Sequence, residues 1–238
     1  MASRYDFSNQ QASVFFLDNS IPTPTRELWP AGLCFDNQII SEVTGIECGS
    51  DGGIEAVARP YQYHSNQVRR VERDGIVGPL EADGLVTELD GFALAVLTAD
   101  CVPVAFSSLG AVGIAHCGWK GIVGGMLSEI VKELREIIGD PLAQVEAAVG
   151  PHICVECYEF EGPSKAEVTG IYGDAPFRTV SSTAHLDLGS LISLELGDLG
   201  VSIAYVDGSC TLETGTLNSF RRDRSELRQT SFVVKGPC

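Results

Sequence analysis

Three short apolar runs follow one another between residues 92 and 116, and any fold of this chain has to accommodate them. The runs are FALAVL, VPVAF and AVGIAH, and the turn-like segment SSLG separates the second run from the third. Continuous apolar runs of this length, bounded by turn signals, are typical of strands inside a folded core. The sequence therefore predicts three consecutive buried strands in the middle of the chain.

Two helices are predicted on the C-terminal side of these strands. Residues 120–138 carry apolar side chains at helical spacing, and this pattern stops at Gly139. The apolar positions are Ile122, Val123, Leu127, Ile130, Val131, Leu134, Ile137 and Ile138. The second helix is expected to begin at Asp187, whose carboxylate can cap the free amides of a first turn, and to end at the glycines at 197 and 200.

The rest of the chain indicates a mixed architecture. The first 58 residues alternate apolar patches with Pro and Gly clusters, which predicts edge strands and loops. Residues 144–150 and 201–206 predict two further strands. Because strands both neighbour each other and alternate with helices, the expected fold class is α+β, with mixed β-sheets and flanking helices. No linker is evident, so residues 1–238 are predicted to form a single domain.

The excess of acidic side chains indicates which kinds of binding partner are disfavoured. The chain has 32 acidic and 16 basic side chains, a formal net charge of -16. Such a surface repels phosphate backbones and anionic lipid headgroups, so nucleic acid and membranes are poor partners, whereas a small ligand remains open. No apolar run approaches the roughly 20 residues of a membrane-spanning helix, and the N-terminus is too polar for a signal peptide. The eight cysteines are sparse enough to favour reduced thiols, so a cytoplasmic location is expected, and no protein partner is inferred.

A small set of residues could hold a metal ion. Cys101 lies between the first two apolar runs, and His116 ends the third, so one hairpin could bring them together. With His64 from a distant polar segment they would supply three ligands, the number typical of catalytic zinc. These residues alone leave the question open, because a thiol on a buried strand is usually a small core hydrophobe and a lone histidine is usually a satisfied polar group.

Six sequence motifs support the interpretation that these three residues bind a metal ion. In chain order they are YQYHSNQV, ADGLVT, LTADCVPVAF, GIAHCGWKG, GPHICVECYEF, and GSCT together with SFRRD. In this combination, over roughly Arg59 to Arg228, the chain resembles the YfiH family, also called the laccase-domain or multicopper polyphenol oxidase family, which includes purine nucleoside phosphorylases. The resemblance implies a YfiH-like fold and about one zinc ion per chain, held by His64, Cys101 and His116.

Other residues are candidates for catalysis and substrate binding. Cys101, His116 and Asp100, which precedes the ligand cysteine, form the expected catalytic group. Adjacent guanidinium forks suit phosphate, and of the two arginines in SFRRD we favour Arg222 over Arg221. The further candidates for substrate or phosphate binding are Lys120, beside a tryptophan, and Gln62, in the motif that contains the first histidine.

The remaining cysteines and histidines are assigned no catalytic role. Cys154 and Cys157 have a CxxC spacing beside His152, which fits a redox pair or half of a structural zinc site. No second pair at matching spacing follows, and in the family that this loop resembles it is not a redox motif, so we interpret both thiols as structural. We interpret His152 and His185 as polar surface groups.

The resemblance implies an enzyme with a zinc cofactor. The expected reaction converts adenosine or inosine and phosphate into free base and ribose 1-phosphate, with adenosine deaminase and methylthioadenosine phosphorylase activity as well. One alternative is a thiol hydrolase linked to peptidoglycan precursors, in which Cys101 is the nucleophile and His116 the base. A second is copper-dependent oxidation of phenols, but multicopper sites need about ten histidines and this chain has four.

Overall fold

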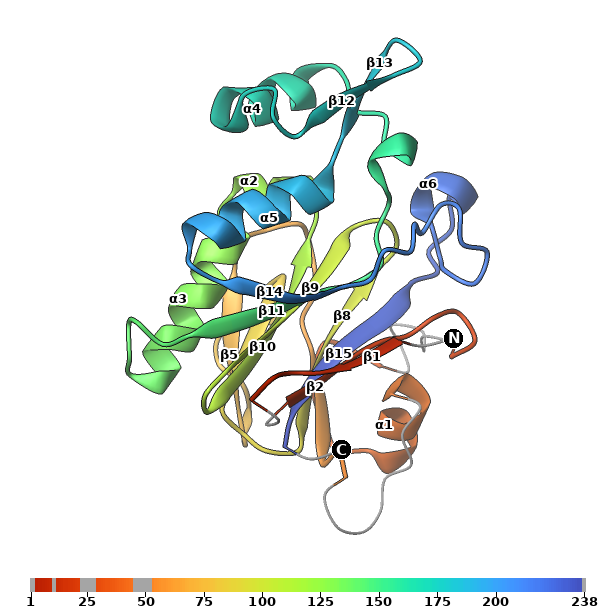
Figure 1. The fold of residues 1–238 in the computed structure, drawn as a ribbon. Helices are drawn as coiled ribbons and strands as arrows, with labels where there is room; N and C mark the ends of the chain where they lie inside the picture. The colour runs from red at the N-terminus through yellow and green to blue at the C-terminus, as the bar shows by residue number, and fades with distance from the viewer. Residues whose placement is uncertain (1–2, 10–11, 22–28, 45–52, 237–238) are drawn as a thin grey trace.

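The computed structural model describes residues 3–9, 12–21, 29–44 and 53–236, which form two large sheets and one small hairpin (Figure 1). In spatial order, the six-stranded sheet contains β1 (Ser3–Asp6), β2 (Ala12–Phe16), β15 (Gln229–Lys235), β8 (Phe92–Thr98), β4 (Ala56–Arg59) and β3 (Gly32–Cys34). The seven-stranded sheet contains β14 (Ser202–Val206), β11 (Val145–Val149), β9 (Val102–Ser108), β10 (Ala111–Cys117), β7 (Gly84–Thr87), β5 (Val68–Glu72) and β6 (Gly75–Ile76). The hairpin pairs β12 (Phe177–Val180) with β13 (Thr183–Leu186).

Helices flank the two large sheets. They are α1 (Asn37–Thr44), α2 (Trp119–Val123), α3 (Met126–Ile138), α4 (Pro163–Tyr172), α5 (Leu188–Asp198), α6 (Phe220–Asp223) and the short 3₁₀-helix η1 (Val155–Cys157). Among the described residues, no helix has the length and apolar character that crossing a membrane requires. Both large sheets are mixed, because β4–β8, β5–β7 and β11–β14 are parallel pairs among antiparallel ones. The α+β class with mixed sheets is confirmed, whereas the extent of the single domain over all 238 residues stays a prediction.

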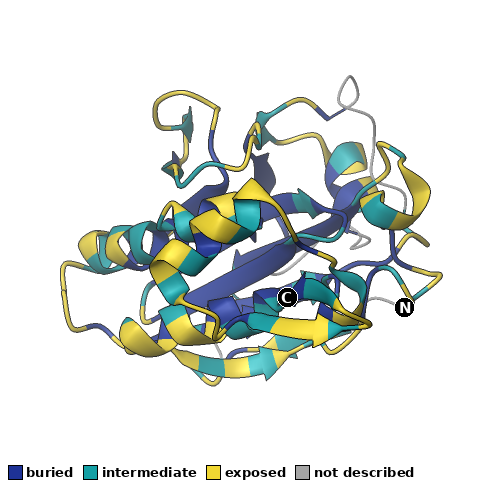
Figure 2. Ribbon diagram, turned by 90° about the horizontal axis from the view of Figure 1, so that it is seen from above, coloured by how far each residue is buried: buried dark blue, intermediate teal, exposed yellow. Residues whose placement is uncertain are grey.

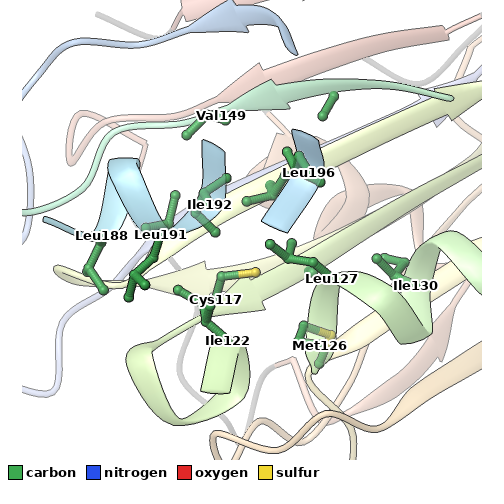
Figure 3. Close-up of a cluster of buried hydrophobic side chains, with 14 of the residues drawn as sticks. Cys117, Ile122, Met126, Leu127, Ile130, Val149, Leu188, Leu191, Ile192 and Leu196 are labelled. Carbon is green, nitrogen blue, oxygen red and sulfur yellow. The ribbon is translucent and has the colours of Figure 1, made fainter. Parts of the chain in front are cut away.

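The two sheets pack face to face and are covered by helices on their outer faces. In β9, the adjacent residues Ala105 and Phe106 belong to different buried clusters, one between the sheets and one beneath α3 and α5. Figure 3 shows the second cluster, in which Leu127 of α3 and Leu191 of α5 lie over the sheet. Figure 2 shows the buried strands inside and the exposed residues on the outer helix faces. A strand buried on both faces needs a continuous apolar run, which explains the pattern in the sequence.

The three predicted strands are confirmed, but they belong to two sheets. The runs correspond to β8, β9 and β10, and β8 lies in the six-stranded sheet whereas β9 and β10 lie in the seven-stranded one. The chain therefore crosses between the sheets at residues 99–101. Cys101 is the last residue of this crossing, so its side chain lies at the junction of the two layers.

The second predicted helix is confirmed together with its cap. The carboxylate of Asp187 accepts a hydrogen bond from the backbone N–H of Ser190, and α5 runs to Asp198, between the two glycines expected to end it. This capping bond satisfies one of the free amides of the first turn.

The prediction for the first 58 residues is only partly right. β1 and β3 are edge strands, but β2 and β4 lie inside the six-stranded sheet. The helix α1 was not predicted, because it has eight residues and its periodic pattern is short. Asp36 caps it by accepting hydrogen bonds from the backbone N–H groups of Gln38 and Ile39. Residues 22–28 and 45–52 of this segment lie outside the described residues.

The predicted single helix over residues 120–138 is wrong in one respect. The structure divides it into α2 and α3, and the division falls at Gly124 and Gly125. Gly125 has φ 88°, a left-handed conformation that glycine adopts without steric cost and that no helix continues through. The apolar side chains on both sides of the break still face the sheet, so the periodicity is correct although the helix is interrupted.

We expect Gly125→Ala to destabilise the protein by about 1–2 kcal/mol, because a Cβ atom is disfavoured at a left-handed position. Gly170→Ala, in α4, is the matched control: nothing lies within 4 Å of its added methyl group, so we expect no loss of stability. Urea unfolding of both variants measures the difference. A neutral Gly125→Ala would show that α2 and α3 can merge into one helix.

Candidate metal centre

The three predicted ligands converge at one end of the two-sheet sandwich. Cys101 immediately precedes β9, and the antiparallel register of β9 and β10 places His116 opposite Pro103. The hairpin therefore brings the thiol and the imidazole to the same edge, as the sequence predicts. His64 reaches this edge from the loop between β4 and β5, and its ring lies 4.8 Å from that of His116, centroid to centroid. The Nε2 atom of His64 lies 3.8 Å from the Cys101 sulfur.

A buried carboxylate holds the two histidines in place. Asp83, fully buried just before β7, accepts backbone N–H bonds from Tyr63, His64 and Ser65 at 3.2, 3.0 and 2.7 Å. One of its oxygens, Oδ1, also lies 2.7 Å from Nδ1 of His116. Because Nδ1 is engaged by Asp83, His116 presents Nε2 to the site. Asp83 thus fixes both the path of the loop that carries His64 and the orientation of the His116 ring.

Sequence analysis missed the role of Asp83. The residue stands in the ADGLVT motif, immediately before a strand, and that position was the available signal. Its partners come from segments far from it along the chain, the nearest 18 residues away and the farthest 33. Nothing local to the motif distinguishes this carboxylate from one that caps a turn.

The arrangement of the three residues fits a metal ion. Their ligand atoms all lie within 4.8 Å of one another, and two imidazole nitrogens with one thiolate are a donor set that suits zinc. The backbone at Gly118 closes the site from one side. A Cβ atom there would lie 2.8 Å from Cδ2 of His64 and 3.1 Å from the Cys101 sulfur, so only glycine allows this close approach.

The electrostatics of the site favour charged groups at neutral pH. Burial opposes ionisation of Cys101, but the charge and hydrogen bonds of His116 and His64 outweigh it and lower the thiol pKa to about 6. Burial also opposes the charged form of His116, yet Cys101 and Asp83 raise its pKa to about 9. For Asp83, burial is outweighed by His116 and by Ser65, and the pKa falls to about 2. The site therefore pairs a thiolate and a carboxylate with an imidazolium.

Asp100 joins segments around the centre. Its Oδ1 accepts a hydrogen bond from Thr211 Oγ1, and its Oδ2 accepts one from the backbone N–H of Arg221, both at 2.7 Å. Its backbone carbonyl accepts from the N–H of Ile153. It adopts φ 88°, a strained value for a residue with a side chain. These contacts make Asp100 a positioning residue for the two loops that follow β11 and β14.

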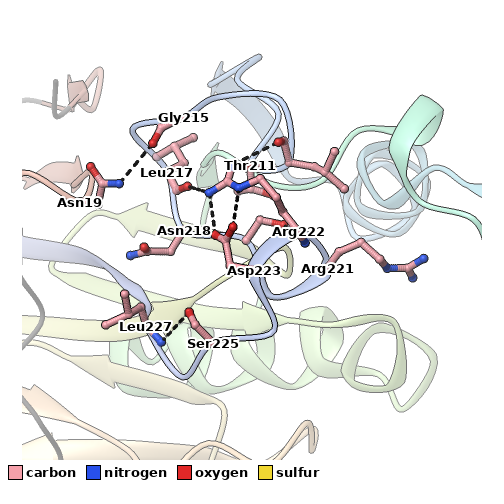
Figure 4. Close-up of polar contacts among 12 residues, drawn as sticks. Asn19, Thr211, Gly215, Leu217, Asn218, Arg221, Arg222, Asp223, Ser225 and Leu227 are labelled. Atoms are coloured by element: carbon pink, nitrogen blue, oxygen red, sulfur yellow. Dashed lines mark hydrogen bonds and ion pairs between the residues drawn. The ribbon is translucent and has the colours of Figure 1, made fainter.

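The two arginines of the SFRRD motif point in different directions (Figure 4). The Arg222 guanidinium turns into the 211–217 loop, where it donates to the carbonyls of Thr211 and Leu217 and pairs with Asp223. It also donates to two further carbonyls of that loop, those of residues 212 and 214. This placement disfavours the phosphate-binding role predicted for Arg222, because its donors are already used inside the loop.

Arg221 is placed differently. Its guanidinium carbon lies 5.1 Å from the ring centroid of Tyr158, and one nitrogen donates to the carbonyl of Glu159 at 3.3 Å. Burial raises the pKa of Tyr158, and the nearby Cys101 charge raises it further, so the phenol stays protonated. The charges of Cys101 and Arg221 both act on Tyr158, which the sequence motifs did not single out.

The structure gives Gln62 a backbone contact and leaves Lys120 exposed. The Gln62 amide pairs with the backbone of Leu97, donating to its carbonyl at 2.9 Å and accepting from its N–H at 2.8 Å. This side chain therefore anchors the loop that carries His64 to β8. Lys120 is exposed in the first turn of α2, and its ammonium lies 5.7 Å from the centroid of the Trp119 ring.

The other two histidines lie outside this centre. His185 is buried and its Nδ1 bonds to the carbonyl of Val155 at 2.8 Å, so its interpretation as a surface group is wrong. His152 is half-buried, and its Nδ1 bonds to the carbonyl of Gly150 at 2.8 Å. Both rings tie loops to neighbouring backbone, which a pattern of residue types does not reveal.

Residues 47–235 match the model of a family described as multi-copper polyphenol oxidoreductase laccase, and the chain belongs to this family. The fold is shared with solved structures: protein NMB0706 of Neisseria meningitidis has a TM-score of 0.77 and 25% identity over 99% of both chains. YfiH of Bacillus licheniformis has a TM-score of 0.76 and 24% identity, covering 95% of this chain and 93% of that one. The resemblance to the YfiH family is thereby confirmed.

Among its curated relatives is purine nucleoside phosphorylase ORF3 of Streptomyces griseus, 37% identical over 153 residues, which are 63% of this chain and 62% of that protein. Adenosine deaminase RL5, from an unknown prokaryotic organism, is 32% identical over 171 residues, 64% of this chain and 63% of that protein. The chain thus spans less than two thirds of the length of these relatives. Their names indicate enzymes that act on purine nucleosides.

We expect Gly118→Ala to weaken zinc binding about 10- to 100-fold, because its methyl group would displace two ligands. Gly197→Ala in α5 is the control, since its methyl group meets nothing within 4 Å. Competition with a chromogenic zinc chelator measures both affinities. Unchanged affinity in Gly118→Ala would place the metal away from His64 and Cys101.

Zinc binding at about pH 7–8 should release about one proton per site. Cys101, with a pKa of about 6, is already a thiolate, whereas His116, with a pKa of about 9, must lose the proton on Nε2. Affinity should therefore rise about tenfold per pH unit until the pKa of His116 is reached. Calorimetry in two buffers of different ionisation enthalpy counts the protons. Release of two protons would mean that Cys101 is a neutral thiol before binding.

Proposed function

We propose that this protein is a zinc-dependent purine nucleoside phosphorylase that converts adenosine or inosine and phosphate into free base and ribose 1-phosphate. The observation that carries the proposal is the position of Arg221, whose guanidinium lies 5.1 Å from the ring of Tyr158, a phenol whose pKa is raised by burial and by the charge of Cys101 in the three-ligand centre. The relatives named as purine nucleoside phosphorylases support the same reaction. The proposed partners are nucleosides and phosphate, and the proposed location is the cytoplasm.

Phosphate binding falls to Arg221 in this proposal. The protein carries a formal net charge of -16, so an anionic substrate needs a local positive charge to bind. Arg221 supplies a planar fork, and Asp100 holds its backbone in place through the 2.7 Å bond to its N–H. The fork lies over Tyr158, which orients it and keeps one face of the guanidinium away from water. Lys120, exposed beside Trp119, is a second candidate for the same anion.

Aromatic side chains provide a surface for the purine base. The ring centroids of Trp119 and Phe160 lie 5.3 Å apart in an edge-to-face arrangement, and Tyr158 lies 5.5 Å from Phe160. A purine can stack on such rings at low conformational cost. Tyr158 also holds a proton on its phenolic oxygen, so we propose that it donates a hydrogen bond, or the proton itself, to the departing base.

The metal ligands have a supporting part in this chemistry. A zinc ion held by His64, Cys101 and His116 would act as a Lewis acid toward an oxygen atom. In phosphorolysis this oxygen would belong to phosphate, and in deamination it would belong to water. Asp83 engages Nδ1 of His116 and so keeps this histidine in the tautomer that binds a metal through Nε2. The same centre is therefore proposed to support adenosine deaminase activity, as the name of one relative suggests, and methylthioadenosine phosphorolysis.

Copper-dependent phenol oxidation, which the family description names, finds little support in this chain. A multicopper centre needs about ten histidines, and the sequence has four. Two of these, His152 and His185, bond to backbone carbonyls outside the centre. Three ligands around one position suit a single metal ion better than a copper cluster.

A thiol hydrolase is the second candidate function, and one specific observation favours it. Cys101, His116 and Asp83 form a series of thiolate, imidazole and carboxylate that resembles a nucleophile, base and orienting group. In that case the thiolate must be free of metal. Added zinc would then inhibit the enzyme, whereas it would support the proposed phosphorylase.

If the protein is a phosphorylase, release of base from inosine should saturate with phosphate and yield ribose 1-phosphate. Arg221→Ala should raise the phosphate KM about 10- to 150-fold, since a charge-assisted contact is worth about 1.5–3 kcal/mol, and should leave the nucleoside KM within about threefold. Arg222→Ala is the matched control: we expect lower stability from the lost loop contacts without a selective rise in phosphate KM. Steady-state assays with both substrates varied measure these constants.

Phosphate-independent formation of free ribose would contradict the phosphorylase assignment itself. A selective rise in phosphate KM for Arg222→Ala, and none for Arg221→Ala, would instead show that the other arginine binds the anion. The two results are distinct because the first concerns the product and the second concerns only the residue.

A further inference from the structure

The structure brings a third thiol to the CxxC pair. In the loop after β11, Cys154 immediately precedes η1 and Cys157 is its last residue, whereas Cys210 follows β14, more than fifty residues further along the chain. The two loops are joined by backbone bonds from His152 N–H to the Ser209 carbonyl and from Thr211 N–H to the His152 carbonyl. The sequence has no second CxxC pair, and the third thiol is a single cysteine from another loop.

Four potential ligand atoms meet at this point. The sulfur atoms of Cys154, Cys157 and Cys210 and a carboxylate oxygen of Glu213 all lie within 4.8 Å of one another. Sulfur ligands at about 2.3 Å from a tetrahedral zinc ion are separated by about 3.8 Å. The four atoms therefore need to move by no more than about 1 Å to enclose a metal. Cys210 is buried, and Glu213 lies on the exposed side.

Backbone amides point at the sulfur atoms. The N–H of Cys154 donates to the Cys210 sulfur at 3.3 Å, and although burial opposes ionisation, the backbone amides around the Cys210 sulfur lower the pKa of this thiol. The N–H of Cys157 donates to the Cys154 carbonyl at 3.1 Å, which closes the turn between these two residues. Amide donors of this kind stabilise the thiolate, which is the form of cysteine that binds metals. The Cys154 amide that points at the Cys210 sulfur therefore favours this thiol as a metal ligand.

We propose that Cys154, Cys157, Cys210 and Glu213 form a second metal site that binds one zinc ion. Three thiolates select a soft or borderline ion over calcium or magnesium, and four protein ligands leave no open position, as in structural zinc sites. The ion links the loop after β11 to the loop after β14. This proposal does not rest on the proposed reaction, because the ligands are different from those of the first centre.

The second site lies next to residues that shape the first. Tyr158 follows Cys157 directly, and Thr211 follows Cys210 and donates to Asp100. Asp100 in turn holds the backbone of Arg221. A zinc ion between the two loops would fix the phenol and the guanidinium relative to the first metal centre. Its loss should lower activity without removing the metal at Cys101.

Zinc content per chain tests the proposal. The full chain is expressed with added zinc, purified with a thiol reductant, dialysed without chelator and analysed for metal. We expect about two zinc ions per chain in the unaltered protein and about one in Cys101→Ala, which breaks the first centre and leaves the second intact. X-ray absorption on Cys101→Ala should show about three sulfur ligands at about 2.3 Å and one oxygen ligand. This variant keeps the test valid even if variants of the cluster fail to fold.

Variants of the cluster complete the design. Cys210→Ser should retain about one zinc ion, in a shell of two nitrogens and one sulfur, and Cys34→Ser in β3 should retain two. Absence of zinc from reduced Cys101→Ala would overturn the proposal. A disulfide among the three thiols, found by mass spectrometry after alkylation, with no zinc uptake after reduction, would also overturn it. Failure of phosphorolysis with both ions present would overturn only the proposed function.

Discussion

The buried carboxylate of Asp83 is the interaction on which the metal centre depends. A charge removed from water costs several kcal/mol unless charged and hydrogen-bonding partners replace the water. Here the partners are His116 and the backbone N–H groups of residues 63–65, so the chain can bury Asp83 only by folding the His64 loop against β10. The stability of the fold and the geometry of the ligands are thus coupled through one side chain. An apolar residue of similar size would fill the space but would leave three amides without acceptors.

The two-sheet sandwich explains why the centre forms where it does. The chain leaves one sheet at the end of β8 and enters the other at the start of β9. The end of β10 and the start of β7 lie at the same edge as the start of β9. Strands are rigid, so a site built at their ends has ligands whose positions vary little. Loops at the same edge then supply the variable chemistry, including the aromatic rings and Arg221. In an acidic protein the proposed phosphate site has to be local, since charges more than about 8 Å away are largely screened at physiological ionic strength.

The loops after β11 and β14 carry Tyr158 and Arg221, the two residues proposed to act on the leaving base and on phosphate. They are held by single polar contacts, such as those of Asp100 with Thr211 and Arg221, and by the saturated guanidinium of Arg222. A metal ion between Cys154, Cys157 and Cys210 would join them more firmly than hydrogen bonds do. Metal binding would give these thiols a role beyond packing, since Cys210 is buried in the core cluster beneath α3 and α5 and Cys154 and Cys157 pack against that cluster.

The sequence by itself determined the features whose cause is local: the apolar runs of β8, β9 and β10, the cap of Asp187, and the strand-end positions of Cys101 and His116. Its motifs also carried the resemblance that favoured His64, Cys101 and His116 as metal ligands. Tertiary structure alone decided the rest. Asp83, Tyr158 and Cys210 acquire their roles from partners far along the chain, and the directions of Arg221 and Arg222 depend on which carbonyls the folded loop offers. A pattern of residue types records neighbours in sequence, whereas hydrogen bonds and metal ligation depend on neighbours in space.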